Sequence, residues 1–256
     1  MNDYLIQEWP SDHVCVLRLN RPDQFNALSR ALVQDLRDAV AGLAASKARV
    51  MVLAANGRGF CAGADLKERK IMSDDEKYTH NRAINALANE ISALPIPTIA
   101  AINGIAMGGG CELSLACDLR FIADNAVIGL TEARIGAMPG AGGSQRLPRL
   151  IGIARALEMM YVGEPISAQK AEAWGLVNAV HPADELDART MDFARPLSAR
   201  SRRSTELLKT SVHRGIEVSL ADGLEIERVA VAEILASRDY KEGLAAFAEK
   251  RAPNFE

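Results

Sequence analysis

The chain has 256 residues, of which 48% are hydrophobic and 25% are charged, and its formal net charge is −3. Such a chain is long enough to bury a substantial core. Its balanced charge excludes the strongly basic surface typical of nucleic-acid-binding proteins and the extreme acidity typical of disordered ones. The N-terminal stretch MNDYLIQEWP lacks a basic segment followed by an apolar one, and no two cysteines form a Cys-x-x-Cys pair. We therefore expect no secretory signal and a cytoplasmic protein with free thiols.

The first half of the chain alternates between segments typical of strands and of helices. Ser29 is suited to cap a helix, which carries a stripe of Leu32, Val33, Leu36, Val40 and Leu43. Short apolar runs predict strands at Val14–Leu19, Val50–Ala54, Thr98–Ile102, Leu119–Ala123 and Val127–Leu130. This alternation predicts an α/β domain.

An uncharged stretch of 21 residues separates Glu90 from Glu112. Its length is that of a membrane-spanning helix, which needs about 20 apolar residues. However, Pro95, Pro97 and four glycines interrupt it, and these residues break helices. We therefore predict a buried strand followed by a glycine loop, and no membrane segment.

The second half of the chain is mostly helical from about Ser144 onward. Ser167 is placed to cap a helix over Ala168–Trp174, which Gly175 ends, and Val177–Val180 is a last short strand. From Leu186 to the end, the pattern predicts several helices with charged faces.

Three glycine-bearing loops carry the candidate functional residues. They are GRGFCAGADLKE (Gly57–Glu68), GIAMGGGCELSLACD (Gly104–Asp118) and TEARIGAMPGAGGSQRLPR (Thr131–Arg149). In the second loop we expect a helix to start at Leu113–Cys117, and a helix N-terminus favours an anion or a developing oxyanion. No phosphate-binding Gly-Lys-Ser/Thr, no Gly-x-Ser-x-Gly and no zinc-binding His-Glu-x-x-His occurs. What remains is a pair of carboxylates, Glu112 and Glu132, beside exposed backbone amides.

Each of these residues also has an ordinary structural interpretation. Glu112 near a helix start is typical of a residue that caps the helix or compensates its dipole. Glu132 beside a turn is typical of a solvated charge, and Cys61 and Cys111 are typical of small buried residues. Lys67, Arg69 and Lys70 are typical of the solvated face of a helix.

Taken together, the loops resemble the crotonase superfamily, and specifically the enoyl-CoA hydratases. The resemblance covers nearly the whole chain and is specific for the family rather than for a substrate. It is carried by six segments: Asn20–Leu28, Gly59–Glu68, Ala100–Asp124, Leu130–Gly152, Ile166–Val180 and Lys241–Phe255.

The resemblance implies a fold and an assembly. The fold would be an α/β spiral of repeated ββα units over residues 1–195, followed by a helical C-terminal region over residues 196–256 that serves trimerisation. A homo-oligomer is therefore expected, either a trimer or a dimer of trimers. Apolar residues in the C-terminal helices fit this expectation, because a small helical tail cannot bury them alone: Leu220, Leu224, Val229, Val231, Ile234 and Leu235.

The resemblance also implies an activity and a site. The activity would be reversible hydration of a 2-enoyl thioester of coenzyme A, with no metal and no cofactor beyond the CoA of the substrate. The family's catalytic glutamates map onto Glu112 and Glu132, and its oxyanion amides map onto Ala64 and Gly109. Residues expected to contact CoA are Ala62, Ala64, Asp65, Leu66, Lys67 and Gly109.

One position departs from the family, and several alternatives stay open. Asp23 stands where relatives often carry a basic residue, so a phosphate contact is not expected there. The glutamates could divide the acid and base roles or share one water. A double-bond isomerase, a hydratase of a branched or aromatic acyl-CoA, and a non-enzymatic scaffold or RNA-binding relative are the alternative functions. The near-neutral charge disfavours the RNA-binding alternative.

Overall fold

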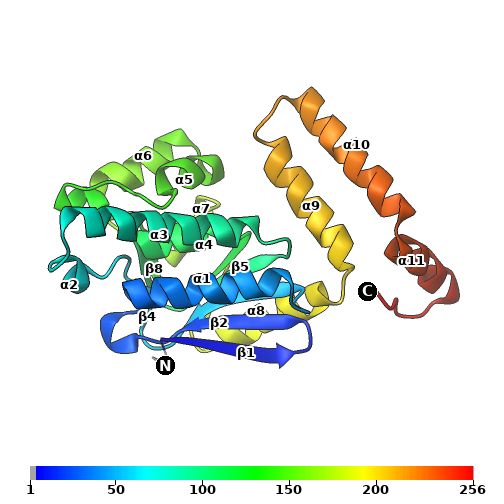
Figure 1. Ribbon diagram of the computed structural model, residues 1–256, viewed down its shortest axis with the longest axis horizontal. Coiled ribbons are helices and arrows are strands. Elements are labelled where there is room, and N and C mark those ends of the chain that lie inside the picture. The colour runs from blue at the N-terminus through cyan, green and yellow to red at the C-terminus, as the bar shows by residue number, and fades with distance from the viewer. Residues whose placement is uncertain (1–3, 256) are drawn as a thin grey trace.

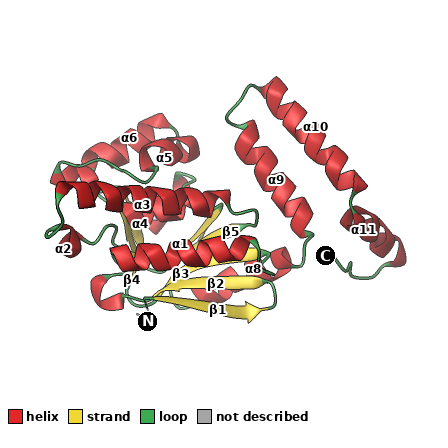
Figure 2. Cartoon of the chain, viewed as in Figure 1, coloured by secondary structure: helices red, strands yellow, loops and turns green. Residues whose placement is uncertain are grey.

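The computed structural model describes residues 4–255. The first three residues of the N-terminal stretch that was considered for a signal lie outside the described residues. Ten strands form two sheets in the described part of the chain, with helices packed around them (Figures 1 and 2).

The larger sheet has six strands in the order β1-β2-β3-β5-β7-β10. β1 pairs antiparallel with β2, and every other pairing in this sheet is parallel. All residues of β3 and β5 are buried, as expected of parallel strands covered on both faces. The strands span β1 Leu5–Ser11, β2 Val14–Leu19, β3 Val50–Ala55, β5 Thr98–Ile102, β7 Leu119–Ala123 and β10 Ala179–His181.

The smaller sheet runs β4-β6-β8-β9 and reveals the repeat of the fold. Three times the chain places one strand in the larger sheet, the next strand in the smaller sheet, and then enters a helix. This confirms the expected α/β spiral of ββα units. The strands span β4 Gly59–Cys61, β6 Ile105–Met107, β8 Val127–Gly129 and β9 Ile166–Ser167.

The helices begin and end at the following residues, with 3₁₀ turns at Pro22–Gln24 (η1) and Glu132–Ile135 (η2). They are α1 Arg30–Ala44, α2 Leu66–Arg69, α3 Asp74–Ala93, α4 Gly109–Ala116, α5 Gly143–Ile151, α6 Ile153–Val162, α7 Ala168–Ala173, α8 Leu186–Ser198, α9 Arg202–Gly215, α10 Leu220–Ala236 and α11 Arg238–Glu249.

The strongest local signals are confirmed. The Ser29 hydroxyl accepts a hydrogen bond from the Leu32 amide at 3.2 Å, and the whole predicted stripe of α1 is buried. Ser167 caps α7 by accepting a hydrogen bond from the Lys170 amide, and Gly175 after this helix has a φ of +77°. Both helices therefore start where a side-chain oxygen satisfies a free amide.

Two boundaries were predicted wrongly. The helix expected at Leu113–Cys117 is α4, which begins four residues earlier at Gly109, because Gly108 has a φ of +52° and its carbonyl accepts the Glu112 amide. The last strand is Ala179–His181 rather than Val177–Val180. The chain first leaves the left-handed Gly175 and pairs with β7 only from Ala179.

Several elements were not predicted. β1 and three strands of the smaller sheet, β4, β6 and β9, are short or half-exposed, so they lack a clear apolar run, whereas β8 lies within the predicted strand Val127–Leu130. α3 is long and polar, but its start had a recognisable signal. Ser73 and Glu76 form a reciprocal capping box at its N-terminus, the Ser-x-x-Glu pattern that the sequence already displays.

The C-terminal helices α9, α10 and α11 extend to one side of the sheets (Figure 1). α8 spans the expected boundary between residues 195 and 196, and the division into two regions stays a prediction. Five of the six apolar residues singled out in α10 are exposed, with Leu220 reaching 79%. None of the helices within residues 4–255 combines the length and apolar character needed to cross a membrane.

Candidate active site

Glu112 lies in the first turn of α4 and is 3% exposed. Its Oε1 atom accepts hydrogen bonds from the Ala141 amide at 2.7 Å and the Gly143 amide at 2.8 Å. Gly143 is the first residue of α5, so the carboxylate satisfies free amides at the start of a different helix from its own. Burial raises the pKa of Glu112, and the two amides oppose that rise. Glu112 is therefore neither a solvated charge nor a cap of α4.

Glu132 lies in η2 and faces the turn that starts α4. A Cβ atom at Gly108 would lie 3.1 Å from Glu132 Oε1. Its other oxygen, Oε2, is buried without a hydrogen-bond partner among the described residues. Burial raises the pKa of Glu132 to about 7, and the nearby charge of Glu112 adds to the rise. The fold thus brings together two carboxyl groups, one of which holds its proton near neutral pH.

Two backbone turns meet beside these carboxyl groups. Gly63 has a φ of +89°, and a Cβ atom there would lie 2.8 Å from the Met107 carbonyl oxygen and 3.2 Å from the Gly109 nitrogen. A Cβ atom at Gly109 would lie 3.7 Å from the Ala64 nitrogen. Only glycine fits the left-handed backbone and this close approach.

The amides of Ala64 and Gly109 are therefore neighbours. Within residues 4–255, neither amide donates a hydrogen bond to a protein acceptor. Gly109 is the first residue of α4, where the helix offers free N–H groups and the positive end of its dipole. This arrangement can bind an oxyanion.

The N-terminal loop Asn20–Leu28 supports the Gly63–Ala64 turn. The Leu28 amide donates to the Gly63 carbonyl at 2.8 Å, and the Asp65 amide donates to the Leu28 carbonyl at 3.1 Å. Arg21 forms a largely buried ion pair with Asp65 at 3.0 Å. Two of the segments that carry the resemblance, Asn20–Leu28 and Gly59–Glu68, thus pack directly against each other.

The residues expected to contact CoA differ in what they can offer. Ala62, Leu66 and Lys67 are exposed. Asp65 is buried, and its carboxylate accepts the amides of Lys67 and Glu68 at 3.1 Å each, in addition to Arg21. The Asp65 side chain therefore serves as the N-cap of α2, and the Asp65 amide is already bonded to Leu28, so Asp65 has no free backbone donor for a ligand.

Arg120 fixes the other end of α4. It is buried, and its guanidinium donates to the carbonyls of Ser114, Cys117 and Leu176 at 3.2, 2.7 and 2.8 Å. A cation is favourable at the C-terminal end of a helix, where carbonyls lack partners. This anchor orients the opposite end of α4, which carries Gly109 and Glu112, toward the site.

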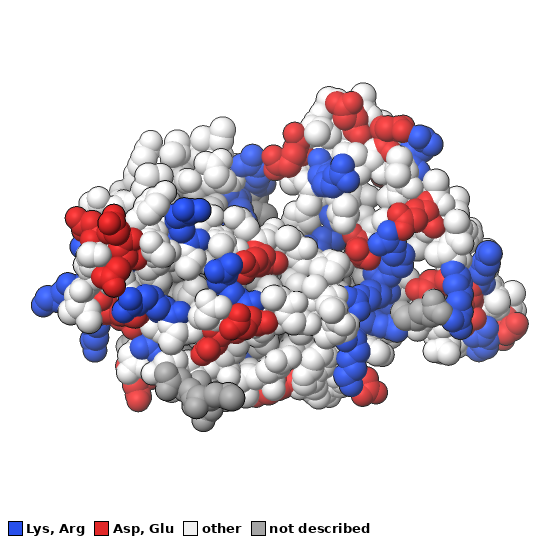
Figure 3. Space-filling model, viewed as in Figure 1, with Lys and Arg blue, Asp and Glu red and all other residues white. Residues whose placement is uncertain are grey.

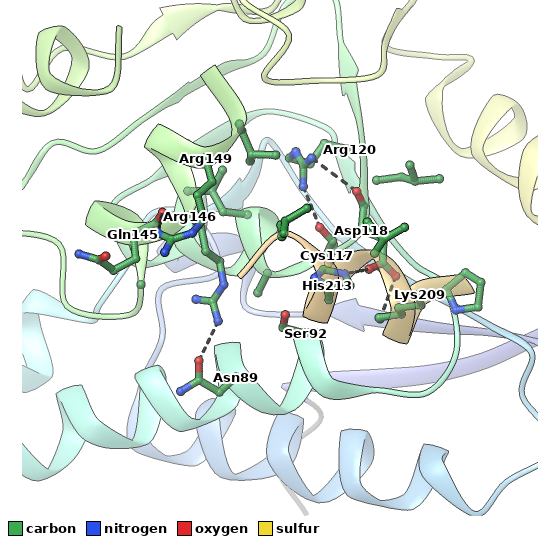
Figure 4. A pocket seen from close by; sticks show the side chains of 18 of the residues that line it. Asn89, Ser92, Cys117, Asp118, Arg120, Gln145, Arg146, Arg149, Lys209 and His213 are labelled. Carbon is green, nitrogen blue, oxygen red and sulfur yellow. Dashed lines mark hydrogen bonds and ion pairs between the residues drawn. The ribbon is translucent and has the colours of Figure 1, made fainter. Parts of the chain in front are cut away.

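A cavity of about 880 Å³ lies between the sheet core and α9. Neither Glu112 nor Glu132 lines it, and both of its acidic residues are paired: Asp118 with Lys209 at 2.8 Å and His213 at 3.1 Å (Figure 4), and Glu217 with Arg149 at 3.1 Å. Arg146 on its wall donates to the Asn89 side chain at 2.7 Å. Among the described residues, the acids that line this cavity are all paired, so we do not place the chemistry there.

The thiols take no part in the site. All four cysteines are free and buried, and burial raises the pKa of the Cys61 thiol to about 12. Such a thiol is inert at neutral pH. Over residues 4–255 no cluster of His, Cys, Asp and Glu has the composition of a metal site.

The structure adds three residues that sequence reasoning missed. Ala141 and Gly143 act through their backbone amides, which no residue pattern reveals. Arg69 was interpreted as part of a solvated helix face, but its Nε is buried and its guanidinium interacts electrostatically with Glu112. The signal available for Arg69 was only its nearness in sequence to the Gly63–Ala64 turn.

Comparison with known proteins yields a consistent set of relatives. A family model described as enoyl-CoA hydratase/isomerase matches residues 10–256. The enoyl-CoA hydratase domain-containing protein 2 of Bos taurus is 44% identical over 252 residues, which cover 96% of this chain and 85% of that protein. A putative enoyl-CoA hydratase/isomerase of Bacillus subtilis is 40% identical, covering 98% and 97%. The crystal structure of an enoyl-CoA hydratase from Bacillus anthracis superposes with a TM-score of 0.97 at 42% identity, covering 98% of both chains.

Proposed function

Because this chain belongs to the enoyl-CoA hydratase/isomerase family, we propose that it reversibly adds water to a 2-enoyl-CoA thioester and forms a 3-hydroxyacyl-CoA. The observation that carries this proposal is the meeting of Glu112 and Glu132 beside the free amides of Ala64 and Gly109. One glutamate alone would suffice to move a proton within the substrate. Addition of water needs a base that takes a proton from the water and an acid that donates a proton to C2.

The amides of Ala64 and Gly109 hold the thioester oxygen. Attack of water at C3 moves the electron pair of the double bond toward C2 and places negative charge on that oxygen, as an enolate. Donors that are already oriented stabilise this charge without reorganisation, and one such donor contributes roughly 3–4 kcal/mol in comparable sites. The dipole of α4 acts in the same direction.

The surroundings of the two glutamates favour a division of roles. Two amides stabilise the ionised form of Glu112, which takes a proton from the attacking water. Glu132 has an unpartnered buried oxygen and a pKa of about 7, so it donates a proton to C2. Each role is typically worth about 10²–10⁴ in rate. The proposed chemistry requires no metal or redox cofactor, because acid, base and oxyanion donors all come from the chain.

The CoA moiety is proposed to bind along the exposed edge of the first glycine loop. Ala62, Leu66 and Lys67 present side chains there, whereas the carboxylate and the amide of Asp65 are already hydrogen-bonded within the chain. Lys67 is exposed and lies three residues after Ala64, so it is placed to meet a phosphate of CoA.

We also propose a homo-oligomer, a trimer or a dimer of trimers, built on α9 and α10. Leu208 and Val212 of α9 and Ile216 directly after it are 60–65% exposed, and Leu220 and Leu224 of α10 are 79% and 56% exposed. A contiguous apolar surface of this kind is typical of an interface. Sedimentation at micromolar concentration tests the proposal, and a stable monomer would contradict it.

Two alternative functions and the cellular location of the protein call for their own tests. A family named for both hydratases and isomerases leaves room for migration of the double bond, for which Glu132 alone could carry the proton. An RNA-binding or scaffold role is less favoured, since acidic and basic side chains lie side by side over much of the face in Figure 3. A cytoplasmic location stays a prediction that cell fractionation would check.

The deciding experiment follows the ultraviolet absorbance of crotonyl-CoA with the purified protein. Hydration removes the conjugated double bond, so the absorbance falls, and mass spectrometry finds a product heavier by one water. An isomerase gives a product of unchanged mass from a suitable longer substrate. If neither a panel of enoyl-CoA thioesters of graded length nor a branched or aromatic one is converted, the proposed activity is wrong.

A further inference from the structure

Three asparagines, Asn81, Asn85 and Asn89, follow one another at four-residue intervals within α3. Side chains at this spacing share one face of a helix. Asparagine is a weak helix former, because its side chain competes for backbone hydrogen bonds. This row faces the loop before α5: Asn85 Nδ2 donates to the Gly140 carbonyl at 3.1 Å, and a Cβ atom at Gly140 would clash with the Asn81 side chain. The row therefore holds this loop against α3.

The Gly140 carbonyl belongs to a peptide group that also binds Glu112. The N–H of the same peptide group is the Ala141 amide, which donates to Glu112 Oε1 at 2.7 Å. A peptide group is planar, so a hydrogen bond that fixes the direction of its carbonyl also fixes the direction of its N–H. The Asn85 side chain thus sets the direction of an amide that holds the Glu112 carboxylate.

Asn85 is oriented in turn by hydrogen bonds that begin at Arg146 of α5. Arg146 Nη2 donates to Asn89 Oδ1 at 2.7 Å (Figure 4), and Asn89 Nδ2 donates to Asn85 Oδ1 at 3.0 Å. Arg146 Nη1 also donates to the Ala141 carbonyl at 2.9 Å. An unbroken row of donors therefore runs from the guanidinium to the Glu112 carboxylate, and each hydrogen bond in such a row polarises the next.

The asparagines differ from the other groups around Glu112 because they carry no charge. Four titratable residues, from α2, α4, α5 and η2, interact electrostatically with Glu112: Arg69, Cys111, Arg146 and Glu132. Replacement of Asn85 or Asn89 by alanine leaves all of these in place. Any effect of such a replacement on the ionisation of Glu112 must therefore pass through the hydrogen bonds.

We propose that Asn85 and Asn89 are positioning residues for Glu112, and that together with Arg146 they form a relay of hydrogen bonds that keeps its carboxylate ionised and oriented. The catalytic consequence of this relay rests on the proposed function. Hydrogen bonds to the ionised form of a carboxyl group lower its pKa, so loss of the relay should raise the pKa of Glu112. The proton then stays on the base to a higher pH, and less of the enzyme is active in acid.

The first test compares Asn85→Ala, Asn89→Ala and Asn81→Ala in the pH dependence of kcat/KM for crotonyl-CoA. Asn85→Ala should move the acidic limb upward by roughly 0.5–1 pH unit, the size expected for one hydrogen bond, and its activity should recover toward neutral pH. Asn89→Ala should give a smaller shift in the same direction. Asn81→Ala removes the same side chain from the same helix face, outside the relay, and should leave the limb unchanged. A loss in Asn85→Ala that is uniform in pH, or an equal shift in Asn81→Ala, would overturn the proposal.

The second test needs no catalysis and measures thermal midpoints at pH 4.5 and pH 8. Because burial raises the pKa of Glu112, its carboxyl group is mostly protonated at pH 4.5 and becomes ionised as the pH rises. Asn85→Ala should therefore lower the midpoint more at pH 8 than at pH 4.5. In the Glu112→Gln background this extra loss should vanish, since glutamine does not ionise. An extra loss of equal size in that background would contradict the relay.

The two tests separate the relay from the hydratase function. If crotonyl-CoA is not hydrated, but the extra loss at pH 8 is found and vanishes with Glu112→Gln, the relay stands and the hydratase function fails. If crotonyl-CoA is hydrated, but neither the acidic limb nor the midpoint responds to Asn85→Ala in this way, the hydratase function stands and the relay is overturned.

Discussion

Replacing Glu132 by glutamine should make the protein more stable and nearly inactive at the same time. Between an ordinary carboxyl pKa of 4.5 and one of about 7, ionisation of Glu132 costs the folded protein at most about 3.5 kcal/mol, because each pKa unit corresponds to about 1.4 kcal/mol. The side chain keeps some contact with solvent, which reduces the cost to about 1.5 kcal/mol. Glutamine keeps the shape of the side chain and carries no charge.

The sign of the effect on stability depends on pH. Below about pH 4.5 Glu132 is protonated in the folded and the unfolded chain, so the substitution changes little. As the pH rises toward 7, the unfolded chain releases the proton while the folded chain retains it, and folding is increasingly penalised. Above pH 7 the full penalty applies, and Glu132→Gln removes it. A gain of about 1.5 kcal/mol corresponds to roughly 3–6 °C in thermal midpoint for a chain of this size.

The assay pairs thermal midpoints at pH 4.5 and pH 8 with kcat on crotonyl-CoA, at one protein concentration. Loss of the proton donor should lower kcat by roughly 10²–10⁴. Glu172→Gln, a change at an exposed position of α7, is the matched control and should alter neither quantity. The reasoning is refuted if Glu132→Gln melts earlier at pH 8 than the unaltered protein, or if it melts later yet retains full activity.

Four further outcomes are expected. Glu112→Gln should keep the fold, because the amide oxygen still accepts the amides of Ala141 and Gly143, while kcat falls by roughly 10²–10⁴. Gly63→Ala should lower the thermal midpoint and the activity together, since its φ is +89° and a Cβ atom would meet a carbonyl oxygen at 2.8 Å. Lys67→Ala should raise KM for crotonyl-CoA more than it lowers kcat, because a remote contact is largely uniform binding. Leu220→Asp should shift the sedimenting species toward smaller assemblies, because it charges the most exposed apolar side chain of α10.

Each of these outcomes has its own control. Glu112→Gln combined with Glu132→Gln should lose much less than the product of the single losses, because groups that act as a unit are not additive; a full product would show that they act independently. Gly42→Ala in α1, where a Cβ atom meets nothing within 4 Å, should leave activity unchanged, so an equal loss there would contradict the steric argument. An unchanged KM for Lys67→Ala at low salt would remove Lys67 from the CoA site. An unchanged assembly for Leu220→Asp would place the interface elsewhere.

The sequence by itself determined the elements whose signals are local. Ser29 and Ser167 cap helices because a hydroxyl three residues before a free amide is a short-range arrangement. Buried parallel strands such as Thr98–Ile102 appear as unbroken apolar runs because both faces are covered. The family resemblance also rests on local motifs. It predicted the fold class and the pair of candidate glutamates. Where local signals were weak, as in the strands β4, β6 and β9 of the smaller sheet, the sequence did not predict the element.

Only the tertiary structure decided which groups meet and in what state. Glu112 and Glu132 are 20 residues apart, and a pKa of about 7 arises from burial and a neighbouring charge, neither of which a residue type encodes. The free amides of Ala64 and Gly109 come from two turns on different ββα units. Arg69 shows the difference most clearly. In the sequence it is one of several charges after a glycine loop, and only packing buries its Nε unpaired beside Glu112, because the cost of an unpaired charge depends on everything that excludes water around it.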